Sequence, residues 1–131
     1  MNDVVEKILG DVPAILAGDK EKLVADAEEF GKYLAKNNLS TSQIRNVFSE
    51  VKKMERYEES KNKLTLMQPK LAYISGRHGK WKNGKLVGAV PDLSRVLSEC
   101  IKNVNDAKSF QNFKQFFEAV LAYHRYYGGK E

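Results

Sequence analysis

The segment from Ala107 to Tyr127 constrains the fold most, because its apolar side chains cover too much of a helix for one neighbour to bury. Asp106 before it is a typical N-cap, and Gly128-Gly129 after it is a typical stop. At about 100° per residue, the apolar, aromatic and histidine side chains spread over more than half of the circumference. They are Phe110, Phe113, Phe116, Phe117, Val120, Leu121, Tyr123, His124, Tyr126 and Tyr127. Such a helix either forms the centre of a bundle or shares its surface with a partner subunit.

The other segments also show helical spacing, so we predict an all-α fold, a compact bundle of about five helices. We expect one helical domain over residues 1–131. Within it, residues 1–18 are expected to be loosely packed, since a loop from Gly10 to Gly18 contains Pro13. The expected helices are Met1–Leu9, a helix capped by Asp19 and running to about Lys36, a helix from Ser40 to near Ser60, a short helix from Pro69 to His78, and one opened by Pro91-Asp92 and reaching Val104.

The helix expected after Ser40 has the clearest start signal in the chain. Ser40 with Gln43 three residues later forms a capping box, in which each side chain bonds the other residue's backbone N–H. Leu39 and Ile44 on either side can form a hydrophobic staple. Gly79 is the expected stop of the following short helix.

Composition excludes several classes of protein. No stretch approaches the roughly 20 apolar residues of a membrane span, and the N-terminus lacks the basic and apolar regions of a signal peptide. Cys100 is the only cysteine, so neither an intrachain disulfide nor a cysteine zinc site is expected. His78 and His124 have no partner in a metal-ligand or catalytic spacing, and no phosphate-binding glycine motif occurs. We therefore expect a cytoplasmic protein that is not an enzyme and uses no metal or cofactor.

Positive charge is concentrated in the window from Ser60 to Pro91, which contains no Asp or Glu. Its net charge is +7, although the whole chain carries only +5. The cations are Lys61, Lys63, Lys70, Arg77, Lys80, Lys82 and Lys85. Such a window favours a polyanionic partner. Its densest part is a basic loop over residues 79–90, between the third and fourth long segments, where Asn83-Gly84 is a turn signal and supports a small hairpin.

A second basic group lies on the helix expected after Ser40. Arg45, Lys52 and Arg56 occupy one narrow strip at positions i, i+7 and i+11, with Lys53 further round. The simple alternative for both groups is a solvated surface. Trp81 in the basic loop is either a packing residue that closes the bundle or a ring on which a base stacks. The candidate nucleic-acid-binding residues are Arg45, Lys52, Lys53, Arg56, Lys70, Arg77, Lys80, Lys82 and Lys85, with Trp81 as the stacking candidate.

Three segments resemble a known family. They are LSTSQIRNVFSEV from Leu39 to Val51, the stretch from Leu66 to Arg77, and FFEAVLAYHRYY from Phe116 to Tyr127. In this order they resemble the small subunit of the type III-A CRISPR–Cas (Csm) effector complex. The resemblance extends over about two-thirds of the chain, and residues 1–38 do not match clearly.

The resemblance implies a non-catalytic helical subunit that stacks in several copies along the guide RNA. It also implies sequence-independent contact with crRNA and target RNA, and contact with the backbone and large subunits of the complex. Arg45, Lys52, Arg56 and Arg77 lie in or beside the matching segments, whereas Lys80, Lys82 and Lys85 are candidates by charge alone. The alternative is a helical protein–protein adaptor that makes no direct RNA contact.

Overall fold

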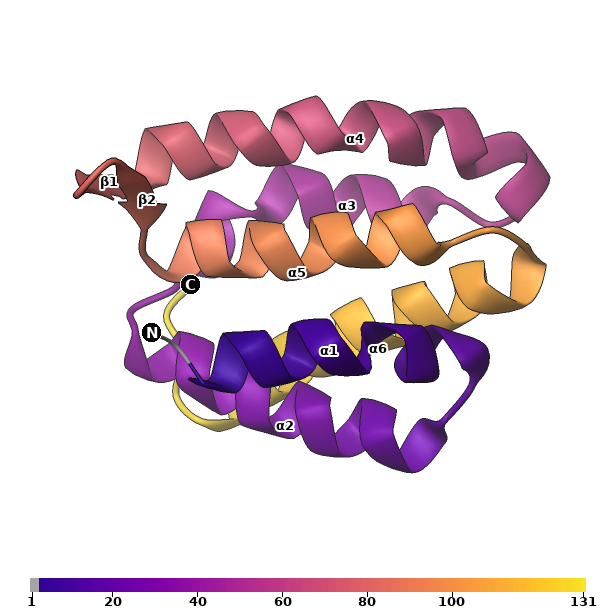
Figure 1. Cartoon of the computed structure of the whole chain (residues 1–131), viewed down its shortest axis with the longest axis horizontal. Coiled ribbons are helices and arrows are strands. Elements are labelled where there is room, and N and C mark those ends of the chain that lie inside the picture. Colours follow the sequence, from indigo (N-terminus) through magenta and orange to yellow (C-terminus); the bar gives the residue numbers. More distant parts are fainter. Residues whose placement is uncertain (1–2) are drawn as a thin grey trace.

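The computed structural model describes residues 3–131, and this part of the chain forms six α-helices and one small hairpin. Successive helices run in alternating directions, with α5 and α6 between an α3–α4 side and an α1–α2 side (Figure 1). The predicted all-α fold is therefore confirmed. The elements are α1 Asp3–Ala17, α2 Lys20–Lys36, the 3₁₀ turn η1 Thr41–Gln43, α3 Arg45–Lys53, α4 Tyr57–His78, β1 Lys80–Lys82, β2 Lys85–Val87, α5 Ala89–Asn103 and α6 Ala107–Tyr126.

Helix α6 is the central helix for most of its length. Phe110, Phe113, Phe116 and Phe117 have no exposed surface. The helix packs against α1, α2, α4 and α5. Asp106 caps it as expected, since its carboxylate accepts from the backbone N–H of Ser109 at 2.8 Å. In its last turn Arg125 and Tyr126 are exposed, while His124 is buried.

The N-terminal part differs from the prediction. The predicted loop from Gly10 to Gly18 is wrong, because α1 continues through Pro13 to Ala17. The expectation of loose packing is also wrong for residues 3–17, which contribute a buried stripe. The stripe is Val5, Ile8, Val12, Ile15 and Leu16. Burial of these side chains against α2, α5 and α6 outweighs the backbone hydrogen bond that Pro13 cannot donate.

In the middle of the chain, the boundary between two helices lies at a different place from the one predicted. The capping box at Ser40 is present and Asp19 caps α2, but the helix after Ser40 stops at Lys53. The backbone is extended at Met54, and α4 then runs unbroken through Pro69 until Gly79 ends it. The predicted helix to Ser60 and the separate helix from Pro69 are therefore wrong.

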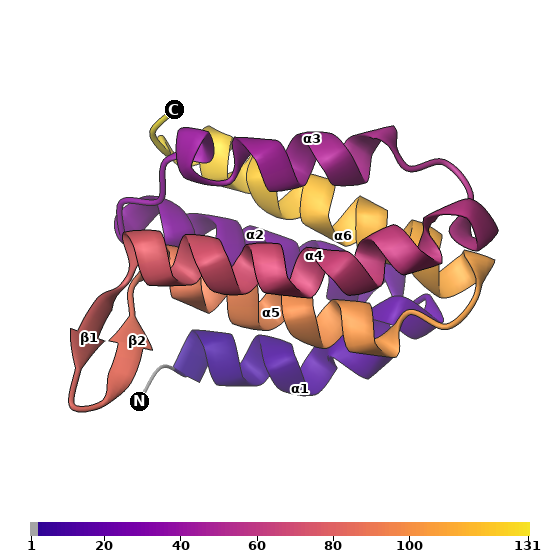
Figure 2. The same ribbon diagram turned by 90° about the horizontal axis from the view of Figure 1, so that it is seen from above.

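The basic loop contains a two-stranded hairpin. Asn83 and Gly84 both have positive φ, 53° and 78°, as a type I′ turn requires. Strand β1 pairs antiparallel with β2, with Trp81 opposite Leu86 and Lys82 opposite Lys85. The hairpin projects beyond the end of the bundle (Figure 2).

Candidate nucleic-acid interface

The molecule is electrically polarised between two opposite sides. Residues 45–85, which form α3, α4 and most of the hairpin, contain eleven Lys or Arg and four Asp or Glu. Residues 3–36, which form α1 and α2, contain five Lys or Arg and eight Asp or Glu. These two parts face away from each other across α5 and α6 (Figure 1). A polyanion is therefore attracted to the side formed by α3, α4 and the hairpin.

Eight of the nine candidate cations lie toward the two ends of this side, while Lys70 lies between them on α4. Arg77 lies in the last turn of α4, directly before the hairpin that carries Lys80, Lys82 and Lys85. Helix α3 runs antiparallel to α4, so Arg45 at its start lies at the hairpin end. The other group, at the far end, is Lys52, Lys53 and Arg56. Because α4 has 22 residues and a length of about 33 Å, Arg56 at its start lies about 30 Å from Arg77 in its last turn, whereas Arg45 and Lys52, seven residues apart on α3, are separated by about 10 Å.

Arg56 does not belong to a strip on α3, contrary to the prediction. It lies in the non-helical segment between α3 and α4 and is the N-cap residue of α4. The predicted strip therefore loses its last member, and Lys52 remains on α3 with its ammonium 5.9 Å from the centre of the Phe48 ring.

All nine candidate cations are exposed, and eight of them have no carboxylate partner. Lys70 is the exception, since its ammonium lies 2.6 Å from both carboxylate oxygens of Glu50. Within residues 3–131, no Asp or Glu forms an ion pair with any of the others. These are Arg45, Lys52, Lys53, Arg56, Arg77, Lys80, Lys82 and Lys85. Free cations on an exposed surface are available to phosphates.

The hairpin separates its cations from its tryptophan. Side chains alternate between the two faces of a strand, so Lys80, Lys82 and Lys85 share one face, and Trp81 and Leu86 share the other. Lys82 and Lys85 are direct cross-strand partners, and like charges in this arrangement repel each other. An anion bound between them relieves that repulsion.

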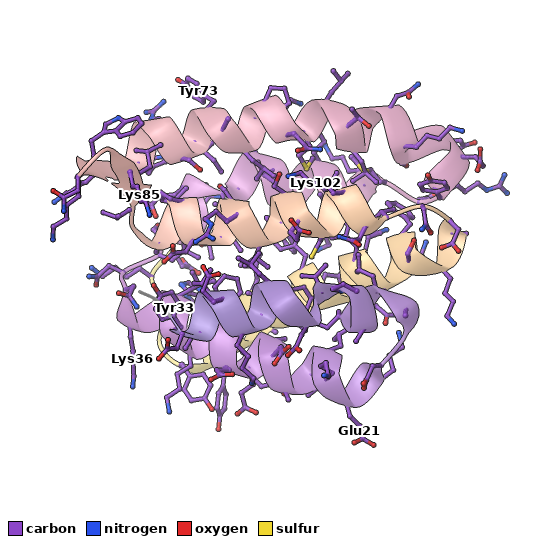
Figure 3. All side chains as sticks on the ribbon, viewed as in Figure 1. Glu21, Tyr33, Lys36, Tyr73, Lys85 and Lys102 are labelled. Carbon is purple, nitrogen blue, oxygen red and sulfur yellow. The ribbon has the colours of Figure 1, made fainter. Side chains whose placement is uncertain are left out.

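Trp81 does not pack in the core, so of the two alternatives for this residue, the one in which it closes the bundle is wrong. Its side chain is 71% exposed. It lines an open groove of about 1120 Å³ between the hairpin and the bundle, together with Tyr33, Asp92 and Arg95. The Tyr33 hydroxyl donates to Asp92 at 2.5 Å, while burial raises the pKa of the Asp92 carboxyl. Figure 3 places Lys85 and Tyr33 at this end of the molecule. Trp81 therefore stays a candidate for stacking.

Two further observations bear on the type of site. No set of three or more His, Cys, Asp or Glu side chains in residues 3–131 is placed to hold a metal ion. Within the same part of the chain, none of the helices combines the length and the apolar character that crossing a membrane requires.

Comparison with known proteins assigns the family. The family model described as Csm2 Type III-A matches residues 17–130, and this range includes every candidate cation and Trp81. The chain belongs to the Csm2 type III-A family. The resemblance to the small subunit of the Csm complex is thereby confirmed, and the family match also covers residues 17–38, which the motifs did not reach.

A curated relative agrees with this assignment. A Streptococcus thermophilus protein named "CRISPR system Cms protein Csm2" is 30% identical over 124 residues, which are 85% of this chain and 95% of that protein. No solved structure matches the chain.

Two exposed apolar residues on the basic side escaped the sequence analysis. Leu66 and Tyr73 of α4 are 64% and 66% exposed. With Lys70 and Arg77 they follow one face of α4 at positions i, i+4, i+7 and i+11. This spacing was present in the sequence, but it identifies a face only when residues 57–78 form one helix.

Proposed function

We propose that this Csm2 family member is a non-catalytic, RNA-binding structural subunit of a type III-A CRISPR–Cas interference complex. The observation that carries the proposal is the set of eight exposed cations without carboxylate partners on the side formed by α3, α4 and the hairpin. Their spread over about 33 Å suits an extended strand better than a compact ligand.

The chemistry of these cations favours backbone contact over base readout. Lysine ammonium groups are flexible point charges, and arginine forks match phosphate oxygens, so both neutralise phosphates of any sequence. The hairpin lysines project from the end of the bundle, whereas Arg77 is fixed by helix α4. The subunit thus holds RNA in place without sequence specificity.

The proposal also places the subunit among partners. Its RNA ligands are the crRNA and the target RNA, and its protein partners are the backbone and large subunits of the complex. Several copies associate along the RNA in the cytoplasm. The exposed Tyr126 at the end of α6 is available for contact with another subunit, since 76% of its surface is open.

A salt titration of the isolated protein against single-stranded RNA tests the proposal. Binding that neutralises about five phosphates gives a slope of log K against log salt near −3.5. Fluorescence anisotropy of a labelled, unstructured oligonucleotide measures this slope directly, and a scrambled sequence of equal length is the control for sequence preference.

Two results would contradict the proposal. A flat salt response means that phosphates are not the ligands, and the subunit is then a protein–protein adaptor. Strong dependence on the RNA sequence means that bases rather than the backbone determine binding.

A further inference from the structure

The outer face of α4 carries an exposed aromatic ring between two cations. Tyr73 lies three residues after Lys70 and four before Arg77, so all three share one face. Figure 3 shows Tyr73 on the outer side of α4. At 66% exposure, the ring contributes little to the core. A free aromatic side chain on the basic side of an RNA-binding subunit requires its own explanation.

Tyr73 forms part of a shallow groove between α3 and α4. The groove has a volume of about 440 Å³. Val47, Pro69 and Ile74 give it an apolar lining, while Asn46 adds an amide. This volume is within the range of small-ligand sites, and an apolar lining with a few polar groups is typical of them.

Charge distinguishes the inside of the groove from its surroundings. Glu50 and Lys70 both line it, and their ion pair at 2.6 Å neutralises them. The free cations lie outside, with Arg77 one helical turn beyond Tyr73 and Arg45 next to Asn46 in sequence. A neutral, partly apolar groove bordered by free cations suits a planar base inside and its phosphates outside.

We propose that the groove between α3 and α4 is a nucleobase subsite, in which an unpaired base of RNA stacks on the ring of Tyr73. The amide of Asn46 then hydrogen-bonds polar atoms at the edge of the base, and Arg77 and Arg45 contact the flanking phosphates. Stacking accepts every base, so the subsite adds affinity without sequence preference. The inference rests on the proposed RNA-binding function and gives that interface a second type of contact.

Abasic RNA separates base stacking from backbone contact. We compare an oligouridylate with an abasic ribose–phosphate oligomer of the same length and charge, each titrated with the whole chain. The wild-type protein is expected to bind the oligouridylate about 5- to 100-fold more tightly, as one stacked base provides. Tyr73→Ala lowers this ratio at least about 5-fold, whereas Tyr73→Phe retains it. Val24→Ala removes an exposed apolar side chain from α2, on the opposite side of the molecule, and leaves the ratio unchanged.

The outcomes distinguish the subsite from the function on which it rests. If the wild-type protein binds both oligomers equally, or if Tyr73→Ala keeps the wild-type ratio, the proposed nucleobase subsite is contradicted. The proposed binding to the RNA backbone is then unaffected. If the wild-type protein binds neither oligomer, both proposals are wrong. Circular dichroism confirms that each variant is folded, which the exposure of Tyr73 leads us to expect.

Photochemical crosslinking locates the stacked base. An oligonucleotide with 5-iodouridine is irradiated with the protein, and the modified peptide is identified by mass spectrometry. We expect crosslinks at Tyr73. Crosslinks confined to Trp81 would overturn the assignment, because Trp81 belongs to the hairpin and does not line this groove.

Discussion

At the scale of single residues, Asp26 on α2 is the most unusual ionisable group. Its side chain is 2% exposed, and Lys7 on α1 donates to one of its oxygens at 3.3 Å. Burial, and then the neighbouring Asp11 carboxyl, raise the pKa of Asp26 to about 6 against the opposing effect of Lys7. Asp11 in turn pairs with Lys22 at 3.4 Å, and Lys7 also contacts Glu29 at 2.8 Å. The contact between α1 and α2 is therefore sensitive to pH.

Replacing Asp26 with Asn should change how stability depends on pH. In the unfolded chain an Asp loses its proton near pH 3.9, whereas folded Asp26 keeps it until about pH 6. The folded state thus binds more protons in this window, and the free energy of unfolding falls as pH rises through it. Asp26→Asn carries no charge in either state, so we expect a smaller fall between pH 4 and 6. Urea unfolding at a series of pH values measures the difference.

Glu21→Gln is the matched control for Asp26→Asn. Glu21 lies on the same helix but points to solvent (Figure 3). This variant should show the same change of unfolding free energy with pH as the wild-type protein. If Asp26→Asn keeps the wild-type dependence of unfolding free energy on pH, another group determines the fall between pH 4 and 6. Asp92, whose pKa is also raised, is such a group.

His124 shows what one residue's position in a pattern can predict. It lies at the centre of the apolar arc of the last helix, which favours a hydrogen-bonded histidine in the core or at an interface over a ligand. In the structure it is fully buried, with Nε2 2.7 Å from the carbonyl oxygen of Leu39. The helical period is enough to place His124 on the apolar face, whereas its hydrogen-bond partner lies 85 residues away and depends on the tertiary fold.

At the scale of elements, the break between α3 and α4 shows why the helix boundaries were mispredicted. Nothing in Met54, Glu55 or Arg56 disfavours a helix strongly. The carbonyl oxygens that the break frees are bound by α6, where Gln111 donates to Glu55 at 3.1 Å and Lys114 donates to Met54. These donors are more than fifty residues away, so local propensity cannot reveal the break. The capping boxes at Ser40 and Asp106 are local, and both were predictable.

The close approach of α2 and α6 gives a test of helix packing. A Cβ atom added at Gly31 would lie 2.7 Å from the backbone N of His124 and the backbone O of Val120. Backbone atoms cannot give way as a side chain does, so Gly31→Ala should force the helices apart. We expect a loss of about 1 to 3 kcal/mol in the free energy of unfolding. Chemical denaturation followed by circular dichroism measures it.

Gly10→Ala is the control for Gly31→Ala, because it makes the same change inside α1 with nothing within 4 Å of the new atom. It should stabilise the protein by about 0.5 to 1 kcal/mol, since Ala loses less conformational freedom than Gly in a helix. If the two variants changed the free energy of unfolding equally, close contact with α6 would not be the reason for glycine at position 31.

At the scale of the whole molecule, the charge pattern predicts the side of the interface but not its shape. The acid-free window from Ser60 to Pro91 contains α4 from Ser60 onward and the whole hairpin, so sequence alone located the basic side. It could not separate the cations into two groups, because that separation follows from the unbroken length of α4. Nor could it show that Lys70 is neutralised by Glu50, which lies twenty residues earlier on the neighbouring helix.

The polarity of the molecule can be tested by placing the same charge change in two places. Lys80, Lys82 and Lys85 are exposed on the hairpin outside the core, so changing all three to Glu should leave the fold intact. If each contacts one phosphate, the slope of log K against log salt moves from near −3.5 to about −1.4. RNA binding at fixed salt weakens accordingly, and anisotropy titration measures both quantities.

The matched variant changes three exposed lysines outside residues 45–85, Lys36, Lys102 and Lys108, to Glu. Figure 3 shows Lys36 on the α2 side, and Lys102 is the second-last residue of α5, at the end away from the hairpin. Net charge falls by the same amount in both variants, but in the second the free cations of the hairpin remain. The slope should stay near −3.5 if local phosphate contacts determine binding. If both variants lose binding equally, the protein attracts RNA through its overall charge, and the side formed by α3, α4 and the hairpin has no special role.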